Sequence, residues 1–337
     1  MINIGILSPA SIAINRFLPA LSKVTSIKFK GVAIANIDER GELFVDGSIE
    51  KSLYRAQKII DLYGGDIYES FHDMLNDDDI DAVYVPLPPI LHYRWAKAAL
   101  LKRKHVFMEK PFTINLNETN DLIRIAKSID IAIYENYMFV HHTQLSEIRK
   151  IINNGTIGDV RDYKISFGFP LRDTKIDFRY KKEYGGGAIF DCAGYPIKLA
   201  SLLLKEAKVV YCNLNYDNPF GIDLFGSIVM EGKDGITAEL SFGMDNGYKC
   251  SLEVWGCKGL LVASRIFTAP NDFNTEYELI KDNKKNSFKI GCDDAFYKSI
   301  IYFVKAINSF EIRKNIYDEI EMQAKHVNDA LRLFDEK

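Results

Sequence analysis

The first 135 residues alternate short apolar runs with segments that carry apolar residues at helical spacing. The runs indicate strands at 2–7, 29–36, 80–88, 104–111 and 129–136, and helical periodicity occupies 11–24, 54–64, 91–104 and 117–129. Strands that are apolar on both faces and separated by helices are typical of a parallel sheet covered on both sides. The pattern therefore predicts a doubly wound α/β Rossmann domain over residues 1–135.

The pattern changes from about residue 157. Runs joined by Gly, Asn and Asp turns predict strands at 159–169, 208–217, 225–232, 235–244, 249–264, 276–281 and 287–291. Helical periodicity lies at 140–153, 186–204, 294–310 and 318–334. We expect residues 136–337 to form an α+β domain with a largely antiparallel open sheet and helices on one face. Residues 38–52 look like a surface insertion after the second strand.

Composition excludes several classes of protein. The 337 residues exceed what one core usually serves, which favours two domains. The net charge of −3, with Lys and Arg scattered along the chain, argues against nucleic acid as a partner. The five cysteines form no CxxC pair and the six histidines show no metal-ligand spacing, so neither disulfides nor a metal is expected. Because no leader or long apolar run is visible, we expect a cytoplasmic protein that does not cross a membrane.

The turn after the first strand, "GILSPASIA" at 5–13, lies where a doubly wound domain binds a dinucleotide. Small residues stand where the fingerprint has glycines, at Ser8, Ala10 and Ala13. A following helix N-terminus attracts phosphate. We expect this turn to bind the cofactor through Ser8, Pro9, Ala10, Ser11 and Ile12.

The end of the second strand bears on the choice between NADP and NAD. It reads Asn36–Ile37, with Asp38 two places late and Arg40 beyond, instead of ending in a carboxylate. A neutral strand end with a nearby arginine tolerates a 2′-phosphate better than a carboxylate does. This favours NADP over NAD, with Asn36 and Arg40 as cofactor contacts.

Two further stretches carry candidate chemistry. In "VFMEKPF", 106–112, an apolar strand ends in Glu109, Lys110 and Pro111, which alone is also what an ordinary polar turn looks like. In "YGGGAIFDCAGYPI", 184–197, Asp191 and Tyr195 are four apart and are expected on one face of one helix. A tyrosine beside a lysine can donate a proton at neutral pH if the lysine charge lowers its pKa.

These pieces, with "DAVYVPLPPILHYRWAKAALLKRKHVFMEKPF" and "GDVRDYKISFGFP" in the same order and spacing, resemble the glucose–fructose oxidoreductase, inositol dehydrogenase and MocA family (Gfo/Idh/MocA). The resemblance spans most of residues 1–204. Tyr195 stands where most members have His, which resembles the branch of nucleotide-sugar ketoreductases. Two departures are that the fingerprint glycines are replaced and that Pro89 stands where an Asn is common.

The resemblance implies an NAD(P)-dependent oxidoreductase of sugars or cyclitols, with Lys110 contacting the reacting oxygen beside the nicotinamide. Its ammonium would stabilise developing alkoxide, and Glu109 would orient or balance it. Tyr195 would then be the proton donor, with Asp191 positioning it or the substrate. Further cofactor contacts are expected from Pro86, Leu87 and His92, although His92 has a capping or packing role as its alternative. Substrate contacts are expected from Tyr137, His142, Arg179 and Tyr195.

Three functions stay open on the sequence. The first is a nucleotide-linked keto-sugar reductase, and the second is a dehydrogenase of free aldoses, cyclitols or dihydrodiols. The third is a non-catalytic dinucleotide-binding regulatory protein. We also expect a homodimer or homotetramer, because "GSIVM" and "TAELSF" suggest an apolar sheet face without helices.

Overall fold

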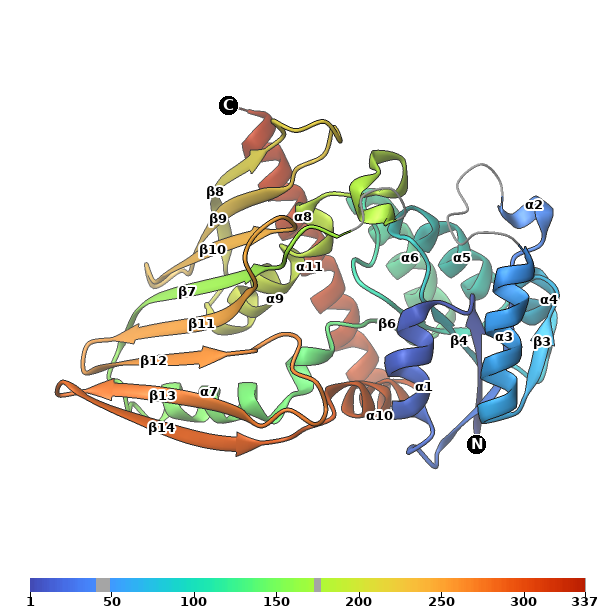
Figure 1. Cartoon of the computed structure of the whole chain (residues 1–337), viewed down its shortest axis with the longest axis horizontal. Helices are drawn as coiled ribbons and strands as arrows, with labels where there is room; N and C mark the ends of the chain where they lie inside the picture. Colours follow the sequence, from blue (N-terminus) through green and yellow to red (C-terminus); the bar gives the residue numbers. More distant parts are fainter. Residues whose placement is uncertain (41–48, 173–176, 337) are drawn as a thin grey trace. The chain divides into compact units, whose positions relative to one another are not determined.

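The computed structural model describes residues 1–40, 49–172 and 177–336, apart from the side chain of Arg40 (Figure 1). These residues form two compact units. Unit 1 comprises residues 1–136, 183–185 and 296–324, and unit 2 comprises 137–182, 186–295 and 325–337. The first transition lies beside the predicted boundary at 135/136. The sequence pattern did not indicate that the chain returns to unit 1 at residue 296.

Unit 1 contains a six-stranded sheet in the order β3-β2-β1-β4-β5-β6, and every neighbouring pair is parallel. This is the doubly wound order of a dinucleotide-binding domain, with its reversal between β1 and β4. The predicted fold class is confirmed. The strands are β1 (Ile2–Leu7), β2 (Ile27–Ala33), β3 (Asp66–Tyr68), β4 (Ala82–Val85), β5 (His105–Met108) and β6 (Ile133–Glu135).

The helices of this part of the chain follow the strands in alternation. A π-helical turn (Ala13–Phe17) leads into α1 (Leu18–Leu21). The others are α2 (Ile37–Arg40), α3 (Ile49–Tyr63), α4 (Phe71–Asn76), α5 (Pro89–Leu101) and α6 (Leu116–Ile129). The sequence pattern did not indicate β3, which is not part of a buried apolar run, or α4, which has fewer than two helical turns.

The helices α10 (Ala295–Asn308) and α11 (Phe310–Asp335) bring the chain back to unit 1. Arg313 explains how the return is fixed. Its buried guanidinium binds both carboxylate oxygens of Asp130 at 2.6 and 2.7 Å and donates to the carbonyls of Ala306 and Ile307. A bidentate arginine–carboxylate pair adds geometric specificity to charge, so it fixes these helices against the end of α6.

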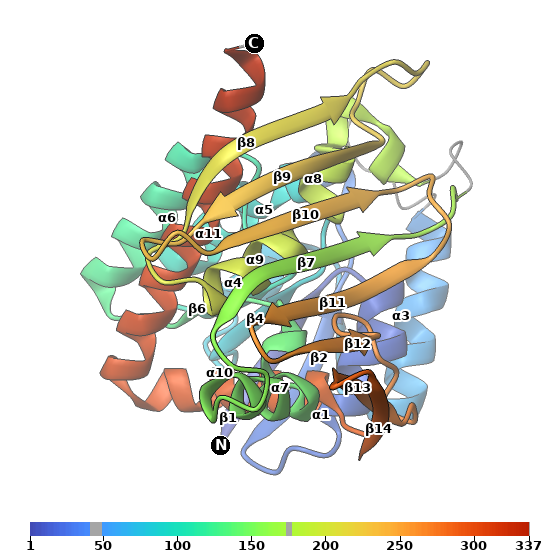
Figure 2. The same ribbon diagram turned by 90° about the vertical axis from the view of Figure 1, so that its left-hand side faces the viewer.

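Unit 2 contains an eight-stranded sheet in the order β14-β13-β12-β11-β7-β10-β9-β8. Only β7 and β10 pair in parallel, so the sheet is largely antiparallel as predicted. Figure 2 shows the broad side of the sheet's strands β7 to β11, with α9 behind them and α7 at the lower edge beside β13. The strands are β7 (Val160–Gly168), β8 (Lys208–Asn215), β9 (Phe225–Glu231), β10 (Thr237–Gly243), β11 (Lys249–Gly256), β12 (Gly259–Ser264), β13 (Thr275–Lys281) and β14 (Lys284–Gly291).

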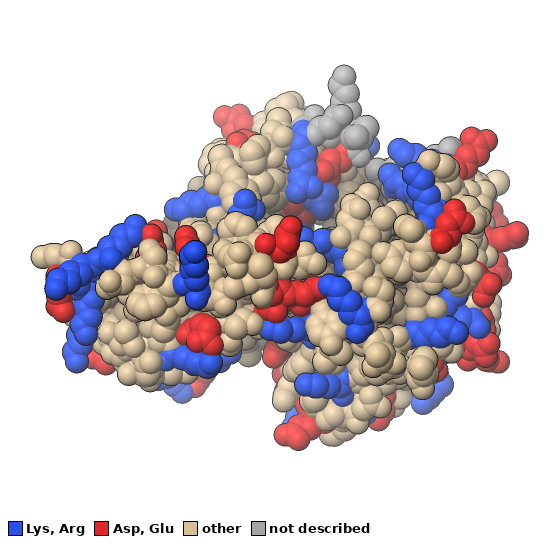
Figure 3. Space-filling view, turned by 60° about the horizontal axis from the view of Figure 1, so that its bottom comes forward, with Lys and Arg blue, Asp and Glu red and all other residues tan. Residues whose placement is uncertain are grey.

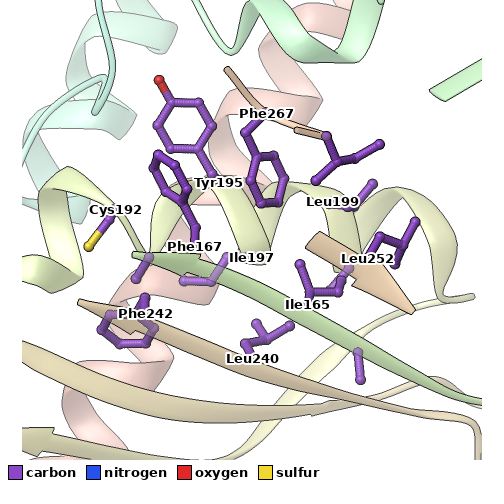
Figure 4. Packing of buried hydrophobic residues seen from close by; sticks show 14 of the residues in the cluster. Ile165, Phe167, Cys192, Tyr195, Ile197, Leu199, Leu240, Phe242, Leu252 and Phe267 are labelled. Atoms are coloured by element: carbon purple, nitrogen blue, oxygen red, sulfur yellow. The ribbon is translucent and has the colours of Figure 1, made fainter. Parts of the chain in front are cut away.

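The core of unit 2 lies between this sheet and the helices α7 (Thr143–Asn153), α8 (Ala188–Asp191) and α9 (Gly194–Leu203). Alternate residues of the strands point into it, including Ile165, Leu240 and Leu252 (Figure 4). The period of two along each strand is what the sequence pattern had indicated.

The uncovered face of this sheet differs from the sequence-based expectation. Ile228, Met230 and Leu240, which made "GSIVM" and "TAELSF" look apolar, all point into the core. The outward positions of β9 and β10 include Ser227, Glu239 and Ser241. Phe225 and Val229 are the apolar outward residues of β9, and Trp255, Leu260 and Ile280 form a further row of cross-strand partners. The face over β9 and β10 is therefore mixed, and the expectation of an apolar face there was wrong.

The helix predicted over 186–204 is two helices. α8 ends at Asp191, and α9 begins at Gly194 after a turn at Cys192 and Ala193. Asp191 and Tyr195 therefore do not share the face of one continuous helix, and that part of the prediction was wrong. Gly194 lies against the Tyr137 hydroxyl, where a β-carbon would stand only 2.0 Å from the oxygen.

Candidate active site

Glu109 is held at the carboxyl end of β5, where the sequence placed the central chemistry. Its Oε1 accepts hydrogen bonds from the Tyr84 hydroxyl and from Asn136 Nδ2, each at 2.8 Å. Burial raises the pKa of the Glu109 carboxyl, and these two donors and the charge of Lys110 oppose that rise. The carboxyl group therefore has a fixed orientation next to Lys110.

The two donors to Glu109 are themselves fixed by other parts of unit 1. The Tyr84 ring stacks on Phe17 of the π-helical turn, with ring centroids 3.9 Å apart. Asn136 Oδ1 accepts from Ser299 Oγ of α10 at 2.7 Å. Sequence reasoning missed Tyr84, Asn136 and Ser299. Only the position of Asn136, directly after the last predicted strand, gave a signal that could have revealed one of them.

The chain on the other side of Lys110 is fixed as well. The Phe112 N–H donates to Glu135 Oε1 at 2.8 Å, and the Pro111 carbonyl lies 2.8 Å from His92 Nδ1. The Lys110–Pro111 peptide bond is cis, and the Lys110 residue is half-buried. Lys110 is thus presented by a segment that side chains hold on both sides.

His92 joins two segments of unit 1. It is completely buried, and its Nε2 lies 2.7 Å from the carbonyl of Leu87, opposite the Nδ1 contact with Pro111. Burial lowers the pKa of the ring, and the nearby Lys110 charge lowers it further. Both ring nitrogens face backbone carbonyls, so a cofactor could contact only the carbon atoms of the ring. The contacts favour the packing interpretation of His92, and contact with the nicotinamide stays a prediction.

The turn after β1 has the backbone conformation that a dinucleotide fingerprint requires. Ser8 has a φ of 96°, a region that favours glycine, and its N–H donates to the Ala33 carbonyl at 3.1 Å. Helical backbone begins at Ser11, two residues before the π-helical turn. Ser8 and Pro9 are buried, and Ser11 is exposed. The turn therefore fits the predicted phosphate contact at Ser8–Ile12.

A cavity of about 590 Å³ opens at the carboxyl ends of β2 and β3. Its lining is mainly apolar, with polar side chains from Asn36, Asp38 and Glu69. Volumes of a few hundred Å³ are typical of cofactor sites, so the cavity fits the adenosine part of a dinucleotide. The side chain of Arg40, the predicted partner of a 2′-phosphate, lies outside the described part of the structure.

Glu39 was overlooked in the sequence, although it stands near the end of the second strand. It forms a capping box with Asn36, in which each side chain accepts from the other residue's N–H at 2.9 and 3.1 Å. Its buried carboxylate also accepts the N–H groups of Phe71 and His72 at 2.9 Å. This acid therefore shapes the turn beside the cavity and is not available to a ribose hydroxyl.

In unit 2, Asp191 pairs with Arg179. Arg179 Nε lies 3.0 Å from Asp191 Oδ1, and Arg179 Nη1 lies 3.1 Å from Asp177 Oδ1. Two carboxylates therefore neutralise the guanidinium that was expected to hold a substrate anion. Asp191 orients Arg179 in this arrangement, and a role for either residue toward substrate stays a prediction.

The Tyr195 ring lies in an aromatic cluster of unit 2. Its neighbours, with ring centroids 5.0 to 5.9 Å away, are Phe139, Phe167, Phe267 and Tyr137. Figure 4 shows Phe167 and Phe267 beside the ring, with the Tyr195 hydroxyl directed away from the strands. The cluster fixes the ring and leaves the hydroxyl at its edge, which suits a proton donor.

His142 has a structural contact that its prediction did not include. It precedes α7, and its Nδ1 accepts the N–H of Gln144 at 3.0 Å, so it caps that helix. The ring is buried. A contact between His142 and substrate stays a prediction.

Asp223 is a buried acid that the sequence did not reveal. Its Oδ2 accepts the N–H of Ile189 at 2.7 Å at the start of α8. A β-carbon on Gly187, whose φ is 124°, would lie 2.4 Å from Asp223 Oδ1. Burial raises the pKa of the carboxyl to about 7, against the three backbone N–H groups that lower it. Glycine at 187 is therefore needed for Asp223 to approach the backbone.

Comparison with known proteins identifies the architecture. Residues 31–137 match the model of the oxidoreductase family with an NAD-binding Rossmann fold, and residues 145–262 match the GFO/IDH/MocA C-terminal domain. A dTDP-3,4-didehydro-2,6-dideoxy-alpha-D-glucose 3-reductase from Actinomadura kijaniata is 32% identical over 332 residues, which cover 98% of this chain and 95% of the relative.

The chain belongs to the Gfo/Idh/MocA family. The family resemblance and the assignment as an oxidoreductase are therefore confirmed.

Two further relatives place the chain within the family. The solved structure of a 3-ketoreductase from Actinomadura kijaniata, in complex with NADP and TDP-benzene, has a TM-score of 0.89 and 31% identity, covering 98% of this chain and 97% of the other. A D-xylose 1-dehydrogenase (NADP(+)) from Haloferax volcanii is 27% identical, covering 91% of this chain and 89% of the relative.

Two searches bear on the expected absence of a metal and of a membrane span. The described residues contain no group of three or more His, Cys, Asp or Glu side chains placed to hold a metal ion. In the same part of the chain, no helix has both the length and the apolar character needed to cross a bilayer.

The surface charge is mixed: acidic and basic side chains are interspersed on the face that Figure 3 shows.

The raised pKa of Asp223 predicts how stability depends on pH. The folded protein keeps this proton up to about pH 7, whereas an unfolded Asp loses it near pH 4. The free energy of unfolding should therefore fall as pH rises from about 4 to 7, by up to about 4 kcal/mol, and level off above. Urea denaturation should show this fall for the wild type and not for Asp223→Asn, with the exposed Asp217→Asn as control. An unchanged slope in Asp223→Asn would contradict the assignment.

Replacing His92 should separate its two interpretations. His92→Phe keeps an aromatic ring but loses the contacts with Leu87 and Pro111, so the segment carrying Lys110 should loosen. Small misplacements near reacting atoms are costly, and we expect kcat to fall roughly 10- to 100-fold. The Kd for NADPH should stay nearly unchanged, as in the neighbouring control Tyr93→Phe. A large rise in that Kd with little loss of kcat would instead make His92 a cofactor contact.

Proposed function

We propose that the chain reduces the keto group of a nucleotide-linked keto sugar with NADPH. The observation that carries this proposal is the 32% identity, over nearly the whole chain, to a dTDP-linked keto-sugar 3-reductase. The fold resembles that of a solved 3-ketoreductase from the same organism, with a TM-score of 0.89. Dehydrogenation of free sugars is represented by a less similar relative. A purely regulatory role would not explain why side chains fix the segment around Lys110 on both sides.

The residues present fit the cofactor. The helix that begins at Ser11 would direct its first N–H groups to the pyrophosphate, and the cavity beside Asn36 would hold the adenosine. NADPH would supply the hydride. The charged side chains in the cavity lining, Asp38 and Glu69, are acidic and cannot attract a 2′-phosphate. We therefore assign the positive charge that a 2′-phosphate needs to Arg40.

Lys110 is proposed to polarise the keto oxygen. An ammonium group at this oxygen stabilises the negative charge that develops as the carbonyl is reduced. Glu109, held by Tyr84 and Asn136, keeps a carboxyl group of fixed orientation next to the lysine. The surrounding hydrogen bonds limit the motion of Lys110 before substrate arrives.

Tyr195 is proposed to donate the proton that the oxygen takes up. Its ring is fixed by four aromatic neighbours, so little rotamer entropy is lost when the hydroxyl meets substrate. Lys110 belongs to unit 1 and Tyr195 to unit 2. Their approach to within hydrogen-bonding reach of one oxygen stays a prediction. Asp191 is proposed to act through Arg179, by keeping it in place beside α8.

A cytoplasmic location is proposed from the state of the thiols. The five cysteines, Cys192, Cys212, Cys250, Cys257 and Cys292, are all free. Two of them are exposed. Free thiols are typical of proteins in reducing compartments.

Initial rates of NADPH oxidation with a dTDP-linked 3-keto sugar test this function. Wild type should turn over this substrate and leave free aldoses nearly untouched. Lys110→Ala should lower kcat by roughly 10²- to 10⁴-fold. Tyr195→Phe should also lower kcat, and its effect on the affinity for substrate should be much smaller. Lys97→Ala is the matched control, because Lys97 pairs with Asp121 at the surface of unit 1. Near-normal turnover in Lys110→Ala would refute the mechanism, and a preference for free aldoses would refute the substrate class.

We further propose that two or four copies associate through the uncovered sheet face of unit 2. Trp255 is 62% exposed there, in one row with Leu260 and Ile280. Light scattering at micromolar concentration should give the mass of a dimer or tetramer. Trp255→Glu should shift the protein to smaller species, whereas Leu62→Glu, at an exposed position of α3, should not. A monomeric wild type would contradict the proposal.

A further inference from the structure

Arg265 differs from the other arginine considered for anion binding in unit 2. Arg179 is neutralised by Asp177 and Asp191. Arg172, near the same end of the sheet, has an Asp177 oxygen 3.9 Å away. No carboxylate within the described ranges forms an ion pair with Arg265. Its charge therefore remains available to an incoming anion.

The Arg265 guanidinium is nevertheless held in place. It lies over the ring of Tyr248, 4.4 Å from the centroid, and 5.5 Å from the centroid of Phe273. Its Nη1 donates to the Tyr248 hydroxyl at 3.0 Å, and this hydroxyl also contacts Thr268 Oγ1 at 3.3 Å. A guanidinium stacked on an aromatic ring keeps its planar fork of N–H donors, and that fork matches the geometry of phosphate.

The backbone at Arg265 supports a functional role. Its φ of 55° is in the left-handed region that non-glycine residues rarely adopt. Such conformations cluster at ligand-binding positions, where the surrounding structure compensates for the strain. The two residues that follow, Ile266 and Phe267, are buried, so this turn is anchored in the core of unit 2.

The same loop also supports Tyr195. Phe267 packs on the Tyr195 ring with centroids 5.6 Å apart, and its N–H donates to Cys250 Sγ at 3.3 Å. Cys250 lies two residues after Tyr248 in the chain. Two residues span at most about 7 Å. Tyr248, which holds Arg265, therefore lies close in the chain to Cys250, which contacts Phe267 beside the Tyr195 ring.

We propose that Arg265 binds the diphosphate of the nucleotide-linked substrate, with Tyr248 and Phe273 holding its guanidinium flat. This inference rests on the proposed function and names the part of unit 2 that selects a nucleotide-linked sugar over a free one. A diphosphate needs charge-assisted hydrogen bonds from a cation that is not already neutralised. The exposed rings of Tyr248 and Phe273 also offer apolar surface on which a base stacks.

Two molecules in this reaction carry a diphosphate group that Arg265 could bind, the nucleotide-linked substrate and the dinucleotide cofactor. We assign Arg265 to the substrate, because the cofactor's phosphate contacts are assigned to the Ser8–Ile12 turn of unit 1. Titrations of the purified full chain with dTDP and with NADPH separate the two. Inorganic pyrophosphate, as a third probe, measures the contribution of charge without the base.

Calorimetric titration of wild type and four variants tests the assignment. Arg265→Ala should weaken dTDP binding roughly 10- to 100-fold, the effect of losing hydrogen bonds to a charged group. Arg265→Lys should recover only part of the loss, since lysine lacks the planar fork. Tyr248→Ala should weaken dTDP binding too. Arg172→Ala is the matched control, because Arg172 also lies over an aromatic ring, 4.7 Å from the Phe169 centroid, but has Asp177 beside it.

The outcomes distinguish this inference from the proposed function. Arg265→Ala should raise the KM for the nucleotide-linked sugar and leave NADPH binding unchanged. Unchanged dTDP affinity in Arg265→Ala, or a loss of NADPH affinity instead, would overturn the assignment while leaving the reductase function intact. A wild type that binds no nucleoside diphosphate and reduces only free sugars would overturn the function itself.

Discussion

The hydrogen bonds at the Glu109 carboxyl group are the interaction on which the candidate site depends. A half-buried acid without donors would be costly to keep at the tip of an interior strand. Hydrogen bonds from Tyr84 and Asn136 offset this cost of burial. Tyr84 is fixed in turn by stacking on Phe17, and Asn136 by a hydrogen bond from Ser299. The backbone that carries the neighbouring Lys110 is thereby held in place. Rigidity of this kind reduces the reorganisation that a charged catalytic group needs.

Much of this architecture could be predicted from the sequence. The two sheets follow from apolar periodicity, since burial on both faces or on one face leaves different patterns. The tip of β5 and the aromatic residue at 195 were identified by motif and resemblance. The strand β3 was missed because it lacks the buried apolar run that revealed the equally short β6, and α4 was missed because it has fewer than two helical turns.

What could not be predicted depends on contacts between distant residues. The break between α8 and α9 is a tertiary effect, because Gly194 packs against Tyr137. The pairing of Arg179 with two acids was likewise invisible in the pattern, and it changed the residue to which substrate binding is assigned. Asp223 gave no signal at all, since an isolated acid in a turn is usually solvated. Its burial follows from the lack of a side chain at Gly187.

The return of the chain to unit 1 has a consequence for its biosynthesis. Ser299 and Asn136 are 163 residues apart in sequence, and Arg313 and Asp130 are 183 apart. A ribosome that has released residues 1–136 has therefore not yet made the helices that complete this unit. Domains commonly fold as they emerge, at about 5–20 residues per second. Here the dinucleotide-binding half must wait for nearly the entire polypeptide, so a nascent chain that stops before residue 296 would leave the strand tip carrying Lys110 without its final support.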